Sequence, residues 1–229
     1  PSRWVNVTLA EGAEAGAPED VAVADLNGDG LPDLIVASEL AHLLYLQNPG
    51  PEAARGGQWP RLIPAGTRGR GSFIRVFFGD LDGDGRPEVI ATNKGAQNPD
   101  PASASPTAIS VFRVVGDPLV DGSWVEHELG RYRVPHNAEP VDMDGDGDLD
   151  IVAGIRAERR LVLFENVSTR GQLAFREHAI ETDGPRAAGF NLAFADLDGD
   201  GRLDIVSAVG AGLGWLRQPE RFGLPWTTT

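Results

Sequence analysis

The stretch DMDGDGDLDIV, residues 142–152, places five aspartates on alternate positions, with two glycines among them. At pH 7 this concentrates negative charge in one short loop, which a folded chain tolerates only with a neutralising partner. Glycine at the sharp turn lets alternate side chains wrap several hard oxygens around one point, which is the arrangement that Ca²⁺ requires. The stretch therefore predicts a calcium-binding loop.

The chain contains four copies of this loop. They begin at Asp25, Asp80, Asp142 and Asp196, and these first aspartates are 55, 62 and 54 residues apart. Each copy carries oxygen-bearing side chains at positions 1, 3, 5 and 9, and glycine at positions 4 and 6. Aspartate and glycine also dominate ordinary solvated turns. Four copies with the same spacing and the same flanks favour metal binding over that alternative.

Magnesium fits this loop less well than calcium, because it demands near-ideal octahedral geometry, and the all-oxygen set disfavours soft metals. The flanks separate the loop from an EF-hand, in which helices surround the loop and position 12 is a bidentate glutamate. Here short apolar runs rich in β-branched residues precede and follow each copy, so each loop is expected at the tip of a β-hairpin. Position 12 holds residues that cannot chelate, namely Val36, Ala91, Ala153 and Ser207.

Two further strands are expected in each repeat. A third apolar run follows each hairpin, at 42–48, 108–115, 161–167 and 213–218. A fourth run begins with an aromatic residue, at 59–65, 124–130 and 175–180. Four short antiparallel strands, repeated, predict an all-β fold, a β-propeller of about four four-stranded blades, each with a calcium-binding hairpin loop.

The motif Asp-x-Asp-x-Asp-Gly-x-x-Asp between two short strands resembles the FG-GAP or VCBS repeat family, which includes integrin α-chain propellers and many secreted bacterial proteins. The resemblance implies a propeller, usually of seven blades, and calcium bound between the innermost strand and the next. Asn27 and Glu88 depart from the commonest residue at their positions. The implied ligands are Asp25, Asn27, Asp29, Asp33, Asp80, Asp82, Asp84, Glu88, Asp142, Asp144, Asp146, Asp150, Asp196, Asp198, Asp200 and Asp204.

We expect one propeller domain or propeller segment over residues 1–229. A strand within residues 1–10 would either close the last blade or belong to a preceding blade. An array cut within the ring would expose apolar blade faces and tend to associate through them. The expected repeats are 19–65, 73–130, 136–181 and 189–229.

Composition limits the partners and the compartment. A formal charge of -14 argues against nucleic acid, and no apolar run approaches the length of a membrane span. The absence of cysteine excludes disulfides and thiol catalysis. The first residues lack the regions of a signal peptide. With the resemblance, these features lead us to expect an extracellular, secreted or cell-surface protein with up to four structural calcium ions.

The connections at the end opposite the calcium loops contain nine of the chain's 20 basic residues. Arginine offers a planar fork to carboxylates and sugar acids, so these loops are a candidate ligand surface. The alternative is that the arginines only solubilise the loops. The candidate ligand-binding residues are Arg68, Arg70, Arg131, Arg133, His136, Asn137, Arg156 and Asn191.

Other residues are expected to pack rather than react. His127 and His178 fall on the expected outermost strand. One aromatic recurs in each repeat, which indicates packing between blades, and these residues are Trp4, Trp59, Trp124, Phe175 and Trp226. We therefore assign no catalytic residue. The first hypothesis is a calcium-stabilised, lectin-like or adhesion module that binds carbohydrate or protein. The alternatives are a sugar-active lyase or dehydratase and a structural segment of a larger cell-surface protein.

Overall fold

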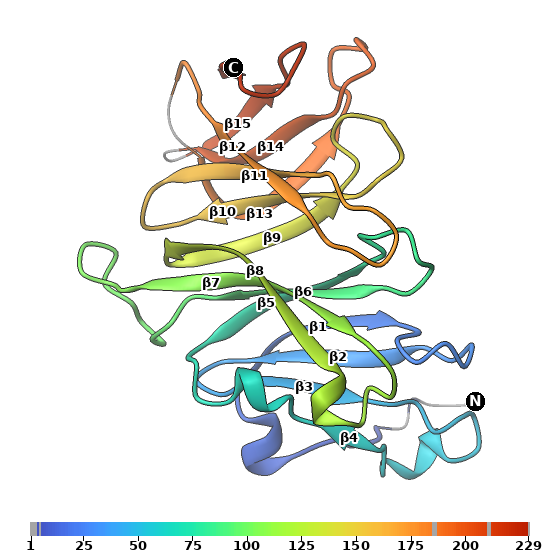
Figure 1. The fold of residues 1–229 in the computed structure, drawn as a ribbon. Helices are drawn as coiled ribbons and strands as arrows, with labels where there is room; N and C mark the ends of the chain where they lie inside the picture. Colours follow the sequence, from blue (N-terminus) through green and yellow to red (C-terminus); the bar gives the residue numbers. More distant parts are fainter. Residues whose placement is uncertain (1–3, 5, 185–186, 210–211, 229) are drawn as a thin grey trace.

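A computed structural model describes residues 4, 6–184, 187–209 and 212–228. The described chain forms four antiparallel sheets of four strands each. In every sheet the strands follow one another in chain order, so each sheet is one repeat. The sheets lie one above another in Figure 1, from the N-terminal repeat in blue to the C-terminal repeat in red. The all-β expectation is therefore confirmed.

Sheet 1 consists of β1 (Pro18–Ala24), β2 (Asp33–Ser38), β3 (Leu43–Leu46) and β4 (Arg61–Leu62). Sheet 2 consists of β5 (Phe73–Gly79), β6 (Glu88–Asn93), β7 (Pro106–Val114) and β8 (Trp124–Arg133). Sheet 3 consists of β9 (Pro135–Val141), β10 (Asp150–Ile155), β11 (Arg160–Asn166) and β12 (Phe175–Ile180). Sheet 4 consists of β13 (Ala187–Ala195), β14 (Asp204–Val209), β15 (Gly212–Arg217) and β16 (Thr227–Thr228).

The helices in the described part of the chain are short 3-10 turns. They are η1 (Gly12–Ala15), η2 (Ala54–Gly56), η3 (Ala65–Thr67) and η4 (Asp121–Ser123). Over the same residues, no helix is long and apolar enough to cross a bilayer.

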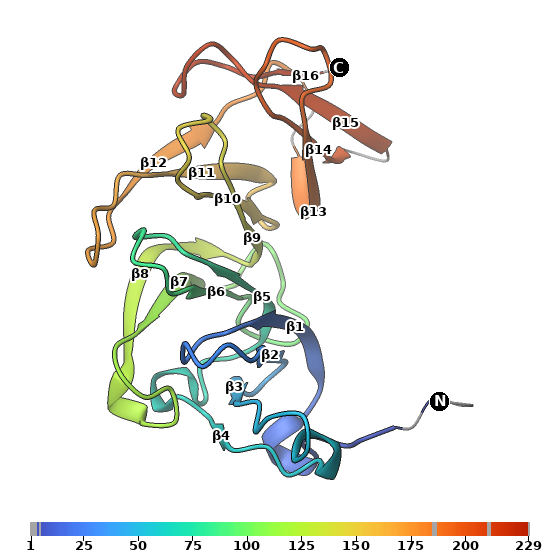
Figure 2. The same cartoon turned by 90° about the vertical axis from the view of Figure 1, so that its right-hand side faces the viewer.

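The first strand of each sheet is the innermost one. Figure 2 shows β1, β5, β9 and β13 following one another along one side of the array, with β8 and β12 on the other side. Each acidic loop connects the first strand of its sheet to the second, as the hairpin prediction requires. The four loops therefore occupy equivalent places in four equivalent sheets.

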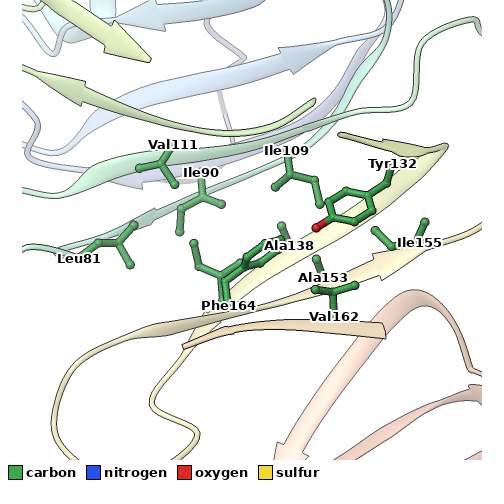
Figure 3. Close-up of a cluster of buried hydrophobic side chains, with 11 residues drawn as sticks. Leu81, Ile90, Ile109, Val111, Tyr132, Ala138, Ala153, Ile155, Val162 and Phe164 are labelled. Carbon is green, nitrogen blue, oxygen red and sulfur yellow. The ribbon is translucent and has the colours of Figure 1, made fainter. Parts of the chain in front are cut away.

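Apolar side chains fill the three spaces between consecutive sheets. Sheets 1 and 2 enclose Ile35, Tyr45 and Val76, and sheets 3 and 4 enclose Val152 and Trp226. Between sheets 2 and 3, a third cluster includes the rings of Tyr132 on β8 and Phe164 on β11 (Figure 3). Each sheet thus packs on its neighbour through a buried apolar layer.

The array is open at its two ends. Among the described residues, no buried apolar cluster joins sheet 4 to sheet 1. Every residue of β6 and β10 is buried, because sheets 2 and 3 are covered on both faces. In β2, Leu34 and Val36 are only half-buried, because sheet 1 is covered on one face only. On the uncovered faces, Val21 is 53% exposed and Leu213 is 81% exposed.

The recurring aromatic residues confirm the packing prediction in three sheets. The Trp124 ring lies 6.0 Å from that of Tyr45 across the interface of sheets 1 and 2. Phe175 packs against the cluster between sheets 2 and 3, and Trp226 is buried between sheets 3 and 4. For Trp4 the prediction is wrong, because its side chain is 98% exposed and no sheet precedes sheet 1 in the described chain.

Two of the expected strands differ in the structure. The described part of segment 1–10, Trp4 and residues 6–10, forms no strand. A strand needs a ladder partner, and no sheet of the described chain offers one to this segment. The expected strand 59–65 shortens to β4, because the flanking Pro60 and Pro64 lack the N–H that a ladder requires.

Candidate metal loops and a basic cluster

The first aspartate of each acidic loop organises the turn around itself. In loop 1 (25–33), Asp25 Oδ1 accepts a hydrogen bond from the Gly28 N–H at 2.8 Å, and Asp25 Oδ2 accepts one from the Gly30 N–H at 2.7 Å. Loop 2 (80–88), loop 3 (142–150) and loop 4 (196–204) repeat the bond between the position-6 N–H and the position-1 carboxylate. The four loops therefore share one backbone geometry.

The glycines at positions 4 and 6 are required by conformation rather than by space. In loop 3, Gly145 and Gly147 have φ angles of 76° and 98°, which L side chains rarely adopt. An added Cβ at either position would meet no atom within 4 Å. The other three loops have positive φ at the same two positions. This turn lets side chains at positions 1, 3 and 5 face a common centre.

Three of the loops bring carboxylates close enough to share one cation. In each group, one oxygen per residue lies within 4.8 Å of the others. The donors are all carboxylate oxygens, which suit a hard cation such as Ca²⁺. In loop 1 the Asn27 amide instead donates a hydrogen bond to Asp29 at 2.8 Å. The groups are Asp80, Asp82 and Glu88; Asp142, Asp144 and Asp146; and Asp196, Asp198 and Asp204.

The acid at position 9 also fastens its loop to the rest of the sheet. Asp150 is 2% exposed. Its Oδ2 accepts a hydrogen bond from the Met143 N–H at 3.0 Å, and its Oδ1 accepts one from the Asn166 N–H at 2.7 Å. Asp33 and Asp204 accept hydrogen bonds from the equivalent N–H groups in their own sheets. In these three sheets, position 9 therefore joins position 2 of the loop to a residue at or just after the end of the third strand.

Burial makes two of the position-9 acids, Glu88 and Asp150, reluctant to ionise. Removal from water raises the pKa of Glu88 to about 7 and that of Asp150 to about 6, and the neighbouring loop carboxylates add to both shifts. A cation bound among the same carboxylates would reverse this effect by stabilising their charged forms. A bound cation would therefore stabilise the ionised carboxylates of loops 2 and 3.

Four of the arginines expected on the ligand surface are engaged within the chain. Arg70 pairs with Glu126 at 2.8 Å, and Arg131 pairs with Glu128 at 2.8 Å. Arg68 and Arg133 donate hydrogen bonds to backbone carbonyls of nearby loops. Asn137 is buried, and its amide donates a hydrogen bond to Glu139. These five residues do not converge on one point. Arg186, counted with the basic loops, lies outside the described residues.

The other three candidates lie together. His136 packs on Phe190 with ring centroids 4.4 Å apart, and the guanidinium of Arg156 lies 5.2 Å from the centre of the same ring. Asn191, beside Phe190 on β13, accepts a hydrogen bond from Arg75 of β5 at 2.8 Å. We call these five residues the basic cluster. Four of them lie on the inner strands of sheets 2, 3 and 4, and Arg156 follows β10, at the end away from the acidic loops.

The imidazole of His136 is neutral at pH 7. Burial lowers its pKa to about 4, and the positive charges of Arg156, Lys94 and Arg75 contribute to the shift. Its Nδ1 is buried and has no hydrogen-bond partner in the described chain. The cluster therefore combines a guanidinium and a neutral imidazole against one aromatic ring with the neighbouring pair of Arg75 and Asn191. Arg75 also lies 3.9 Å from the Asp20 carboxylate. Guanidinium groups suit a carboxylate-bearing ligand.

Two residues of the basic cluster, Arg75 and Phe190, were not predicted. The signal for Arg75 is a charged side chain inside an inner strand, in the stretch FIRVFFG (73–79). The outer-strand histidines lie elsewhere, as expected. The His127 ring packs 5.8 Å from that of Phe175, and His178 Nε2 lies 2.5 Å from a Glu165 oxygen.

Comparison with known proteins agrees with this repeat structure. The family model of the FG-GAP-like repeat matches residues 25–91 and 142–207, which together make up more than half of the chain. Each match starts at the first aspartate of an acidic loop and runs into the second strand of the following sheet, so each includes two loops. No curated protein matched the chain.

Proposed function

Because the chain belongs to the FG-GAP-like repeat family, we propose that it is a binding module built of propeller blades, stabilised by calcium and active outside the cell. The four sheets, over repeats 19–65, 73–130, 136–181 and 189–229, would be four blades. The two uncovered end faces would pack on further blades of a larger ring. Extracellular modules typically bind calcium with dissociation constants of about 0.1–1 mM, so we expect affinities in that range.

The ligand-binding part of the proposal rests on the basic cluster. Binding residues usually lie on the loops and strand ends of a rigid scaffold, and these five side chains come from three different sheets. An arginine over an aromatic ring, with the second arginine bonded to Asn191 of the same strand as that ring, favours an anionic ligand with a planar acid group. We therefore propose a carboxylate-bearing carbohydrate, or an acidic segment of a protein, as the ligand.

Calcium binding is tested on metal-stripped protein by titration calorimetry and thermal melting. We expect heat on addition of calcium and a melting temperature higher in millimolar calcium than in chelator. Each occupied loop should contribute about 1 kcal/mol to the free energy of unfolding. Identical unfolding curves in calcium and chelator, with no heat of binding, would contradict the proposal.

Ligand binding is tested on an array of acidic glycans, neutral glycans and acidic peptides. We expect binding to acidic members only, reduced about tenfold in Arg156→Gln and in Arg75→Gln, because each loses one charged fork. Arg131→Gln is the matched control, since that arginine is paired with Glu128 outside the basic cluster. Equal losses in all three variants, or no loss in the first two, would reject the basic cluster as the binding site.

A further inference from the structure

The four sheets differ at one equivalent position beside the acidic loop, a residue at or within one position of the end of the third strand. The register identifies this position, because Phe112, Phe164 and Leu216 pair with the residues that follow the position-9 acids of their own sheets. Leu46 does the same in sheet 1. The next residue in each sheet lies beside its acidic loop, and these residues are Gln47, Arg113, Glu165 and Arg217.

In sheet 2 this residue places a positive charge on the loop. Arg113 Nε lies 3.2 Å from Asp82 Oδ2, and its Nη2 lies 3.5 Å from Asp84 Oδ2. The side chain of Asp82 is fully buried. The Arg113 Nη1 also donates a hydrogen bond to the Gly171 carbonyl at 2.8 Å, which holds the guanidinium in place. Loop positions 3 and 5 thus have a cation supplied by the chain itself.

Sheet 4 repeats this arrangement. Arg217 forms ion pairs with Asp198 and Asp200, again positions 3 and 5 of the loop. Arg202, at position 7 of the same loop, pairs with Asp200 as well. Loop 2 also has arginine, Arg86, at position 7. Loops 2 and 4 therefore each have two arginines within or beside four carboxylates.

Loop 3 has the opposite charge at both positions. Its third-strand residue is Glu165, and its position 7 is Asp148. Glu165 is itself held by Arg176 at 2.9 Å. Within the described chain, Asp142, Asp144 and Asp146 have no ion-pair partner.

We propose that this third-strand residue grades the calcium affinity of the four loops. The inference rests on the proposed calcium binding and adds that the sites are unequal. Arg113 and Arg217 act as internal cations that hold loops 2 and 4 together without metal and oppose Ca²⁺ there, because like charges repel strongly at such short range. Glu165 leaves loop 3 without an internal cation, so loop 3 binds calcium most tightly. Loop 1, with Gln47, is intermediate.

Calorimetry with calcium alone tests the order of affinities. Wild-type protein is expected to show one tight site and weaker ones. Arg113→Gln and Arg217→Gln should each tighten one weak site about five- to tenfold, because a partly exposed opposing charge is removed. Glu165→Arg should weaken the tight site about tenfold or more. Arg131→Gln, outside the loops, should leave every affinity unchanged.

Thermal melting gives a second readout that a purely structural arginine would not produce. In chelator, Arg217→Gln should melt below wild type, because four loop carboxylates lose one of their counter-charges. Saturating calcium should then raise the melting temperature of Arg217→Gln by more than it raises that of the wild-type protein. Equal losses in both conditions would assign the arginine to structure alone and overturn the inference. Arg217 pairs within its own sheet, so this variant tests the proposal even if Arg113→Gln disturbs sheet 3.

The outcomes for the two proposals are distinct. No calcium heat from any loop of the wild-type protein would reject the proposed function, and the graded affinities with it. Four equal sites that stay unchanged in Arg113→Gln and Arg217→Gln would reject the grading and leave calcium binding intact.

Discussion

Gly154→Ala is expected to lower the free energy of unfolding by at least about 3 kcal/mol, the upper range for overpacking a dense interior. Gly154 lies on β10, where the backbone of β13 in the next sheet approaches it. A Cβ at Gly154 would lie 2.0 Å from the Gly189 carbonyl oxygen and 2.5 Å from the Gly189 Cα. Both neighbours are backbone atoms, so no side chain can move aside and the sheets must separate.

Denaturant titration and amide hydrogen exchange measure this effect. Because each sheet packs only on its neighbours, the variant should expose sheet 4 before the rest of the array unfolds. Gly212→Ala is the matched control, since Gly212 is likewise a strand glycine, on β15 of sheet 4, and an added Cβ there meets no atom within 4 Å. Similar unfolding curves for the two variants would contradict this account of the interface.

The sequence predicted the features that arise within one repeat. The acidic loops, the hairpins around them and the third strands could be predicted because glycine conformation, carboxylate spacing and apolar runs act over a few residues. The short β4 could also have been predicted, because Pro60 and Pro64 stand in the printed sequence. The strand expected over 59–65 was too long, because it was inferred from the recurring aromatic Trp59 without the effect of the missing proline N–H groups.

Features formed between repeats were not predictable from local patterns. Arg75 and Asn191 are 116 residues apart, and only the curvature of the array brings their side chains together. The close approach of Gly154 and Gly189 likewise depends on how two sheets pack. Arg70 and Arg133 indicated a basic loop face, yet their partners come from another strand and another loop. The sequence shows which charged residues are present, and the fold determines which of them are paired with other groups of the chain.

Asp150→Ala is expected to destabilise the protein by about 3 to 4 kcal/mol in chelator as well as in calcium. The substitution leaves the N–H groups of Met143 and Asn166 without their acceptor, and both residues are buried. Each lost hydrogen bond to a charged group is worth about 1.5–3 kcal/mol. The elevated pKa of Asp150 shows that burial of its charge already has a cost, which keeps the expected loss below the sum of the two bonds.

Asp146→Ala separates this fastening role from metal binding. Asp146 is exposed at position 5 of the same loop, and its carboxylate accepts a single backbone hydrogen bond, from the Asp148 N–H at 2.9 Å. Loss of the Asp146 carboxylate should change the melting temperature little in chelator. It should remove the increase in melting temperature that calcium bound at loop 3 provides, and melting in both conditions measures this. If Asp150→Ala behaved in the same way, its carboxylate would act through the metal alone. A large loss without calcium would instead establish that position 9 holds each hairpin to its sheet before any ion binds.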